Sequence, residues 1–167
     1  DFARATSEDF TGDVLAGVAY LKSRRDIDPA RIGLIGHSEG GIIAPIVARM
    51  HADLAALVLM AGTAKDGVAV LRDQVTWPSA SAPGLGEDRK RELIAQAVRE
   101  IERDTTPQPW LQFFRAYDPL PTARRVRQPV LILQGALDRQ VTAGQADTLG
   151  AAIRSGGNRD VTVRIFP

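Results

Sequence analysis

Short apolar runs alternate along the chain with longer segments of mixed polarity. Four of these runs hold mostly hydrophobic residues between turn formers, at residues 31–36, 54–60, 129–134 and 161–166. An apolar run of this length is typical of a strand that is buried on both faces of a sheet. The pattern therefore predicts four buried strands.

Between the strands, hydrophobic residues recur at the spacing of an amphipathic helix. We predict helices at about residues 7–25, 39–50, 87–103 and 142–154. Thr6 and Asp9 have the spacing of a capping box at the start of the first helix. Pro45 should bend the second helix, because proline removes a backbone donor.

Strands that alternate with helices predict an α/β fold, in which helices flank a partial parallel sheet. The 167 residues suffice for one domain, with a helical insertion at about residues 63–127 and a loop at residues 77–84 inside it. Asp1 is not an initiator methionine, and Pro167 follows what reads as a strand end. We therefore expect the domain to be incomplete, with both of its ends outside this chain.

Composition removes several classes of function. The net charge is +1 and the arginines are scattered along polar helix faces, which gives little support for nucleic-acid binding. The chain has no cysteine, which excludes disulfides, cysteine-bound zinc and a thiol nucleophile. No stretch approaches the roughly 20 apolar residues of a membrane span. No signal peptide is visible, and the sequence leaves the compartment open.

Residues 36–40 read Gly-His-Ser-Glu-Gly, a G-x-S-x-G motif between a predicted strand and a predicted helix. This context is that of a nucleophile elbow, a sharp turn that lifts a serine hydroxyl clear of its neighbours. The backbone at the serine is strained, so Gly36 and Gly40 should be small to avoid clashes. Ser38 is then the candidate nucleophile, at a helix N-terminus that favours developing negative charge. The Glu39 backbone N–H is the candidate oxyanion donor.

A carboxylate partner should follow a later strand, because a triad in this kind of fold has the chain order serine, acid, histidine. Asp138 meets this expectation, since it comes directly after the predicted strand at residues 129–134. Its carboxylate would accept a hydrogen bond from an imidazole and fix the tautomer. Asp118, in an Asp-Pro turn of the insertion, is the alternative.

Neither histidine of the chain fits the role of the base. His37 adjoins Ser38 in the turn, where consecutive side chains should diverge. His51 lies at the far end of the predicted helix, about 20 Å from Ser38 at 1.5 Å per residue, and should face solvent. The lysines fall on or beside surface helices and loops, at Lys22, Lys65 and Lys90. We expect the base a few residues beyond Pro167, after the last strand.

Residues 31–41 and 129–141 resemble the elbow and the acid loop of bacterial α/β-hydrolase esterases, within the prolyl-oligopeptidase-like and dienelactone-hydrolase-like group. The resemblance implies an α/β-hydrolase fold and a serine hydrolase. It carries over Ser38 as the nucleophile, Asp138 as the acid and the Glu39 amide as an oxyanion donor. It also implies that the histidine and the second oxyanion donor lie outside this chain.

The resemblance also makes the insertion at residues 63–127 a small helical cap over the active site. Its aromatic residues would line an acyl pocket or pack the cap onto the body, and their spacing near one helical face favours packing. These residues are Trp110, Phe113, Phe114 and Tyr117.

The expected activity is hydrolysis of small-molecule carboxylic esters without a metal or organic cofactor. A peptide substrate on the same nucleophile is one alternative. A non-catalytic binding module on the same scaffold is another, because a fold alone does not determine function. The chain taken by itself is expected to be inactive, since its base is missing.

Overall fold

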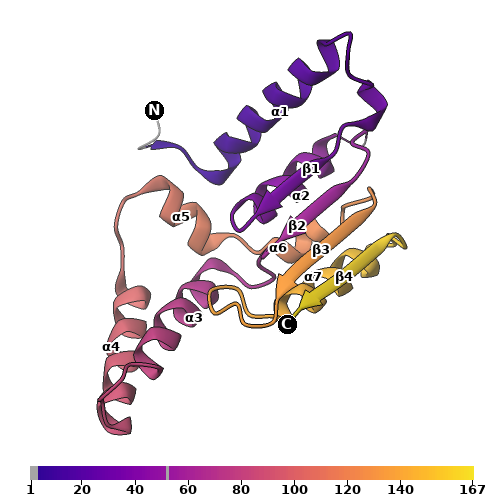
Figure 1. The fold of residues 1–167 in the computed structure, drawn as a ribbon. Helices are drawn as coiled ribbons and strands as arrows, with labels where there is room; N and C mark the ends of the chain where they lie inside the picture. Colours follow the sequence, from indigo (N-terminus) through magenta and orange to yellow (C-terminus); the bar gives the residue numbers. More distant parts are fainter. Residues whose placement is uncertain (1–3, 52) are drawn as a thin grey trace.

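The computed structural model describes residues 4–51 and 53–167. Four strands form one parallel sheet in the order β1-β2-β3-β4, and helices alternate with them (Figure 1). The strands are β1 (Leu34–His37), β2 (Leu57–Met60), β3 (Val130–Gly135) and β4 (Val161–Phe166). The helices of the body are α1 (Ser7–Ser23), η2 (Pro29–Arg31), α2 (Gly40–Met50), α6 (Pro119–Ala123) and α7 (Gly144–Ser155). Three further helices, α3 (Gly67–Ala80), α4 (Glu87–Arg103) and α5 (Pro109–Ala116), separate β2 from α6.

The predicted parallel α/β sheet is confirmed, with all four strands in place. Three strands begin later than predicted, β1 and β2 by three residues each and β3 by one. Residues 29–31 form a 3-10 turn ahead of β1. Asp28 starts the 3-10 turn by accepting a hydrogen bond from the Ala30 N–H at 2.9 Å. A proline inside this turn has no N–H to pair, so the chain enters the sheet only after it.

In the described part of the chain, the helices that touch the sheet pack on one face. Alternate strand residues such as Leu59 and Ile132 are fully buried there against α2 and α7. The opposite face is more open, and Ile35 on it is 74% exposed, so the prediction of strands buried on both faces is wrong. Helix α1 packs on α2, and the predicted capping box of Thr6 and Asp9 is present at its start.

Helices α3, α4 and α5 are named the cap helices here. Helices α3 and α4 form a hairpin that projects away from the sheet (Figure 1). The predicted loop at residues 77–84 is partly wrong, because α3 continues through Trp77 and Pro78 to Ala80. Asp66 starts this helix by accepting a hydrogen bond from the Ala69 N–H at 2.9 Å. Pro78 lies in the last turn of α3, where the loss of one N–H bond does not end the helix.

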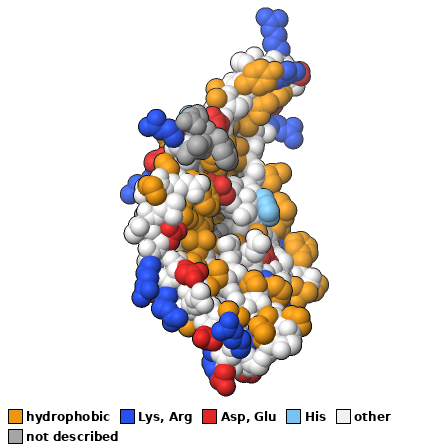
Figure 2. All heavy atoms as spheres, turned by 90° about the vertical axis from the view of Figure 1, so that its left-hand side faces the viewer, with side chains coloured by type: hydrophobic (Ala, Val, Ile, Leu, Met, Phe, Trp, Pro, Cys, Tyr) orange, Lys and Arg blue, Asp and Glu red, His pale blue; other side chains and the backbone are white. Residues whose placement is uncertain are grey.

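Surface charge is mixed on the face that the cap helices turn to solvent. Figure 2 shows Lys and Arg side chains scattered among Asp and Glu, with hydrophobic side chains gathered between them. No described helix is long and apolar enough to cross a membrane. The described residues also contain no cluster of three or more side chains suited to a metal ion.

Candidate active site

Ser38 sits in a sharp turn between β1 and α2. Its φ angle is +53°, and among the described residues only Ala61, at +50°, shares a positive φ without being glycine. The Ser38 N–H donates to the Met60 carbonyl at 2.9 Å, and the Ser38 carbonyl accepts from the Gly41 N–H at 2.8 Å. A strained residue costs about 1–3 kcal/mol and is held only where the surroundings demand it. The predicted strand, turn and helix around Ser38 are therefore all present.

Close backbone contacts explain the glycines of the turn. A Cβ atom on Gly36 would lie 2.1 Å from the Gly40 carbonyl oxygen, and one on Gly41 would lie 2.6 Å from the Gly62 Cα. Gly36 must therefore be glycine, as predicted, and Gly41 brings α2 against the end of β2. The same prediction is wrong for Gly40, because a Cβ there would meet no described atom within 4 Å apart from its chain neighbours and the backbone of its own helix.

Gly36→Ala should lower the free energy of unfolding by about 3 kcal/mol, since its methyl group meets backbone that cannot move aside. Urea unfolding of the full-length protein measures this loss. Gly40→Ala is the matched control, two residues beyond Ser38 at the start of α2. It should leave stability unchanged or raise it by up to about 1 kcal/mol, because alanine favours a helix over glycine. Equal losses in both variants would contradict the described turn.

Asp138 is held rigidly in the loop after β3. Its Oδ1 accepts hydrogen bonds from the backbone N–H groups of Gln140 at 2.9 Å and Val141 at 3.0 Å. Its Oδ2 accepts from the Gln134 side-chain amide at 3.0 Å, and the same amide donates to the Val141 carbonyl at 2.7 Å. Gln134 is 2% exposed, and its bond to Asp138 is partly buried. A carboxylate has about four acceptor positions, which leaves Oδ2 able to accept another donor.

The turns of Ser38 and Asp138 lie at the same edge of the sheet, because both follow parallel strands. Strand β2 separates β1 from β3, and two strand spacings amount to about 10 Å. Strand β4 pairs with β3 and ends beside the acid loop, where the Phe166 carbonyl accepts from the Ala136 N–H at 2.6 Å. An open cavity of about 270 Å³ lies at this edge, and its walls include His37, Asp138 and Phe166.

The alternative acid, Asp118, has a structural role in the fold. Its side chain accepts from the Leu120 N–H at 3.0 Å and so caps α6, which packs against α2 and α7. The lysines form ion pairs with neighbouring carboxylates, Lys22 with Asp53, Lys65 with Asp73 and Lys90 with Glu87. His51 is half exposed at the far end of α2.

A cavity of about 180 Å³ lies beside Ser38, and α3 and α5 line part of it. Most of its walls are apolar, and the polar side chains among them are those of Ser38, Glu39, Thr63 and Gln74. The apolar walls come from α2, the end of β2, α3, α5 and the acid loop, as Ile42, Ala61, Val70, Leu71, Trp110, Phe114 and Val141. Elements that are far apart in sequence thus meet around the Ser38 hydroxyl.

The aromatic residues of α5 and the Tyr117 that follows it pack this helix onto the body, as their spacing predicts, and two of them also line the cavity. Trp110 and Phe114 stack with ring centroids 5.2 Å apart and line the cavity. Phe113 and Tyr117 stack at 5.3 Å and pack with Phe114 into the apolar cluster that joins α5 to α2 and α3. Burial raises the pKa of the Tyr117 phenol, so this side chain stays neutral at physiological pH.

The Glu39 side chain makes two contacts that the sequence did not reveal. Its Oε1 accepts hydrogen bonds from the Ser7 hydroxyl at 2.7 Å and from the Trp110 indole N–H at 2.6 Å. These donors lie 32 residues before and 71 residues after Glu39, so no local pattern connects the three residues. The sequence predicted a role only for the Glu39 backbone.

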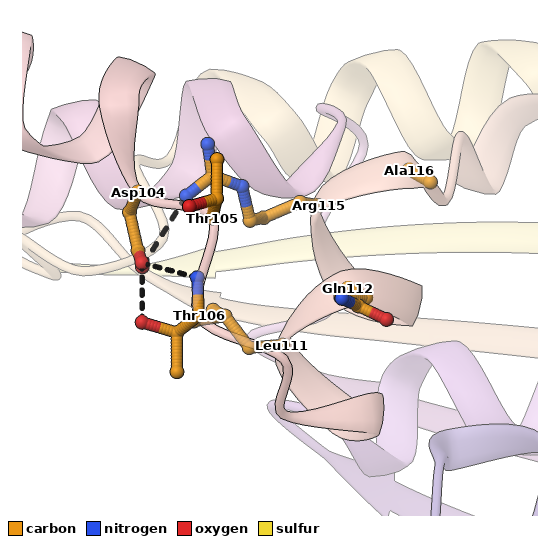
Figure 3. Close-up of a pocket in the computed structure, with 7 residues that line it drawn as sticks. All are labelled: Asp104, Thr105, Thr106, Leu111, Gln112, Arg115 and Ala116. Atoms are coloured by element: carbon orange, nitrogen blue, oxygen red, sulfur yellow. Dashed lines mark hydrogen bonds and ion pairs between the residues drawn. The ribbon is translucent and has the colours of Figure 1, made fainter.

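A larger hollow of about 410 Å³ lies beside the loop between α4 and α5 (Figure 3). It shares no lining residue with the cavity beside Ser38. The carboxylate of Asp104 is already occupied there, since it accepts from the Thr106 N–H at 2.8 Å and pairs with Arg115 at 3.5 Å. The hydrogen bonds from Thr106 lower the pKa of Asp104. We therefore place the candidate site at Ser38.

Residues 3–167 match the prolyl oligopeptidase family. The chain belongs to this family. The proteins to which it is similar include an esterase and an acylaminoacyl peptidase, both of them hydrolases. The chain is 29% identical over 136 residues to esterase EstD of Thermotoga maritima, which covers 78% of this chain and 32% of EstD. It therefore spans about a third of the length of that relative.

Two solved structures share the fold at lower identity. An acylaminoacyl peptidase of Pyrococcus horikoshii has a TM-score of 0.63 and 18% identity over 98% of this chain and 24% of its own. An esterase of Pyrococcus furiosus has a TM-score of 0.64 and 18% identity over 95% of this chain and 52% of its own. The predicted α/β-hydrolase fold is confirmed by these likenesses.

Proposed function

We propose that the protein is a serine hydrolase of small-molecule carboxylic esters, with Ser38 as its nucleophile and Asp138 as its acid. The observation that carries this proposal is the strained Ser38, exposed at a helix N-terminus and lining an apolar cavity. A strained serine serves no packing purpose at an open edge, whereas it suits attack on a substrate held in the cavity.

The chemistry follows from the position of each group. The Ser38 oxygen attacks the acyl carbon, and its proton passes to an imidazole base and then to the leaving alcohol. The first N–H groups of a helix have no intrahelical acceptor, so the Glu39 N–H is available to the oxyanion. Water then attacks the acyl-enzyme and releases the acid. These reaction steps require no metal or organic cofactor.

The base would come from the segment that follows β4. That strand ends beside the Asp138 loop, and Phe166 lines the same cavity as Asp138 and His37. A histidine a few residues after Pro167 would thus enter between the carboxylate and Ser38. The Oδ2 atom of Asp138 could accept a hydrogen bond from the imidazole N–H of that histidine.

A peptidase on the same nucleophile is the second candidate, and the acylaminoacyl peptidase of similar fold favours it. The esterase relatives and the small apolar cavity favour esters. We expect the full-length protein to show a kcat/KM for p-nitrophenyl butyrate at least about 100-fold above that for an N-acetyl-alanine p-nitroanilide. A larger kcat/KM for the anilide would make the protein a peptidase.

A further inference from the structure

The carboxylate of Glu39 joins three elements next to the candidate nucleophile. Glu39 itself precedes α2, Ser7 is the first residue of α1, and Trp110 lies in the first turn of α5. Both hydrogen bonds end on Oε1, and the Ser7 side of this junction is fully buried. Hydrogen bonds to an ionised acceptor are about twice as strong as those between neutral groups. The junction therefore holds α5 in a defined position over the turn.

Trp110 converts that position into the shape of the cavity. Its indole lines the cavity beside Ser38 and stacks nearly parallel to Phe114, with an interplanar angle of 6°. The bond from Nε1 to Glu39 fixes how the ring is turned, because an indole has a single polar atom to anchor. The Glu39 side chain, next to Ser38 in the chain, thus fixes the Trp110 wall of the cavity.

The cavity that results is small. Its volume is about 180 Å³. A cavity of about 150 Å³ suffices for one benzene ring. The space beside Ser38 therefore matches an acyl group of about one aromatic ring or six carbon atoms, and the Trp110 indole forms one of its walls.

We propose that Glu39 is a specificity-determining residue, which limits the acyl group by holding the Trp110 indole as one wall of the cavity. The inference rests on the proposed function, because it assigns the cavity to the acyl group of an ester attacked by Ser38. The backbone N–H of Glu39 would then stabilise the oxyanion, while the Glu39 side chain would hold the wall of the acyl cavity.

Glu39→Met in the full-length protein removes the acceptor while keeping the length of the side chain. We expect the ratio of kcat/KM for p-nitrophenyl butyrate to that for p-nitrophenyl decanoate to fall about tenfold, because the freed Trp110 wall would admit the longer acyl chain. Glu39→Gln keeps an acceptor oxygen and should hold this ratio within about twofold. Trp110→Phe removes the donor and keeps an aromatic ring, so it should shift the ratio in the same direction even if Glu39→Met does not fold. A uniform loss for both esters in both variants would overturn the proposal.

A second measurement separates this inference from the proposed function. In the full-length protein, the part of the tryptophan fluorescence that Trp110→Phe removes belongs to Trp110, and acrylamide quenching of that part reports the exposure of the indole. Glu39→Met should raise the quenching constant about twofold, because the indole loses its anchor. Unchanged quenching overturns the inference whatever the activity. Ester hydrolysis that persists in Ser38→Ala overturns the proposed function, while the quenching still decides whether Glu39 holds Trp110.

Discussion

Ser38→Ala in the full-length protein should lower kcat/KM for p-nitrophenyl butyrate by a factor of roughly 10⁴ to 10⁶. The substitution removes the hydroxyl that would form the acyl-enzyme and leaves the rest of the site in place. What activity remains would come from binding and from the oxyanion donor alone. Initial rates over a range of ester concentrations measure the loss.

The interpretation needs a protein that is still folded. Ser38 already has a positive φ, and alanine meets the same strain there, so the urea midpoint should stay close to that of the wild type. Ser81→Ala is the matched control, since Ser81 is exposed at the end of α3. It should keep the wild-type kcat/KM. Turnover retained in Ser38→Ala would remove Ser38 from the mechanism.

Asp138→Asn should lower kcat/KM by a factor of roughly 10³ to 10⁴, because an amide cannot fix the imidazole tautomer or stabilise its charged form. A stability cost should accompany this loss. The carboxylate accepts from two backbone N–H groups through Oδ1 and from Gln134 through Oδ2. An asparagine has one oxygen, so one donor would face an NH₂ group, at a cost of about 1–3 kcal/mol in urea unfolding.

Asp118→Asn tests the competing assignment. Asparagine caps a helix as well as aspartate does, so the bond from the Leu120 N–H should persist and stability should change by less than about 0.5 kcal/mol. The kcat/KM should stay within about threefold of the wild type if Asp138 is the acid. The opposite pattern, with activity lost in Asp118→Asn and kept in Asp138→Asn, would make Asp118 the acid.

Local patterns were enough to predict the sheet and the turn at Ser38. A buried strand needs a run of apolar residues, and residues 129–134 supply one that can be read without any knowledge of neighbours. The turn needs a residue without a Cβ at Gly36, and the contact with the Gly40 carbonyl explains why. These features depend on residues that are close in sequence.

The rest depends on contacts between distant segments. The Glu39 carboxylate meets Ser7 and Trp110 only once the chain has folded, so its role had no local signal. The loop predicted at residues 77–84 is partly wrong for a similar reason, because α3 continues through Trp77 and Pro78 to Ala80. A proline near the end of a helix breaks few hydrogen bonds, so Pro78 does not end α3. Trp77 also contacts a distant segment, since the guanidinium of Arg139 in the acid loop lies 5.8 Å from the centre of its ring.

Covalent labelling tests the role of Ser38 most directly. An alkyl fluorophosphonate reacts with an activated serine and adds its phosphonyl group to the oxygen as fluoride leaves. Digestion of the labelled full-length protein followed by mass spectrometry should place the added mass on the peptide that contains Ser38, and Ser38→Ala should abolish it. Labelling on another residue, or equal labelling of Ser38→Ala, would contradict the assignment of Ser38 as the nucleophile.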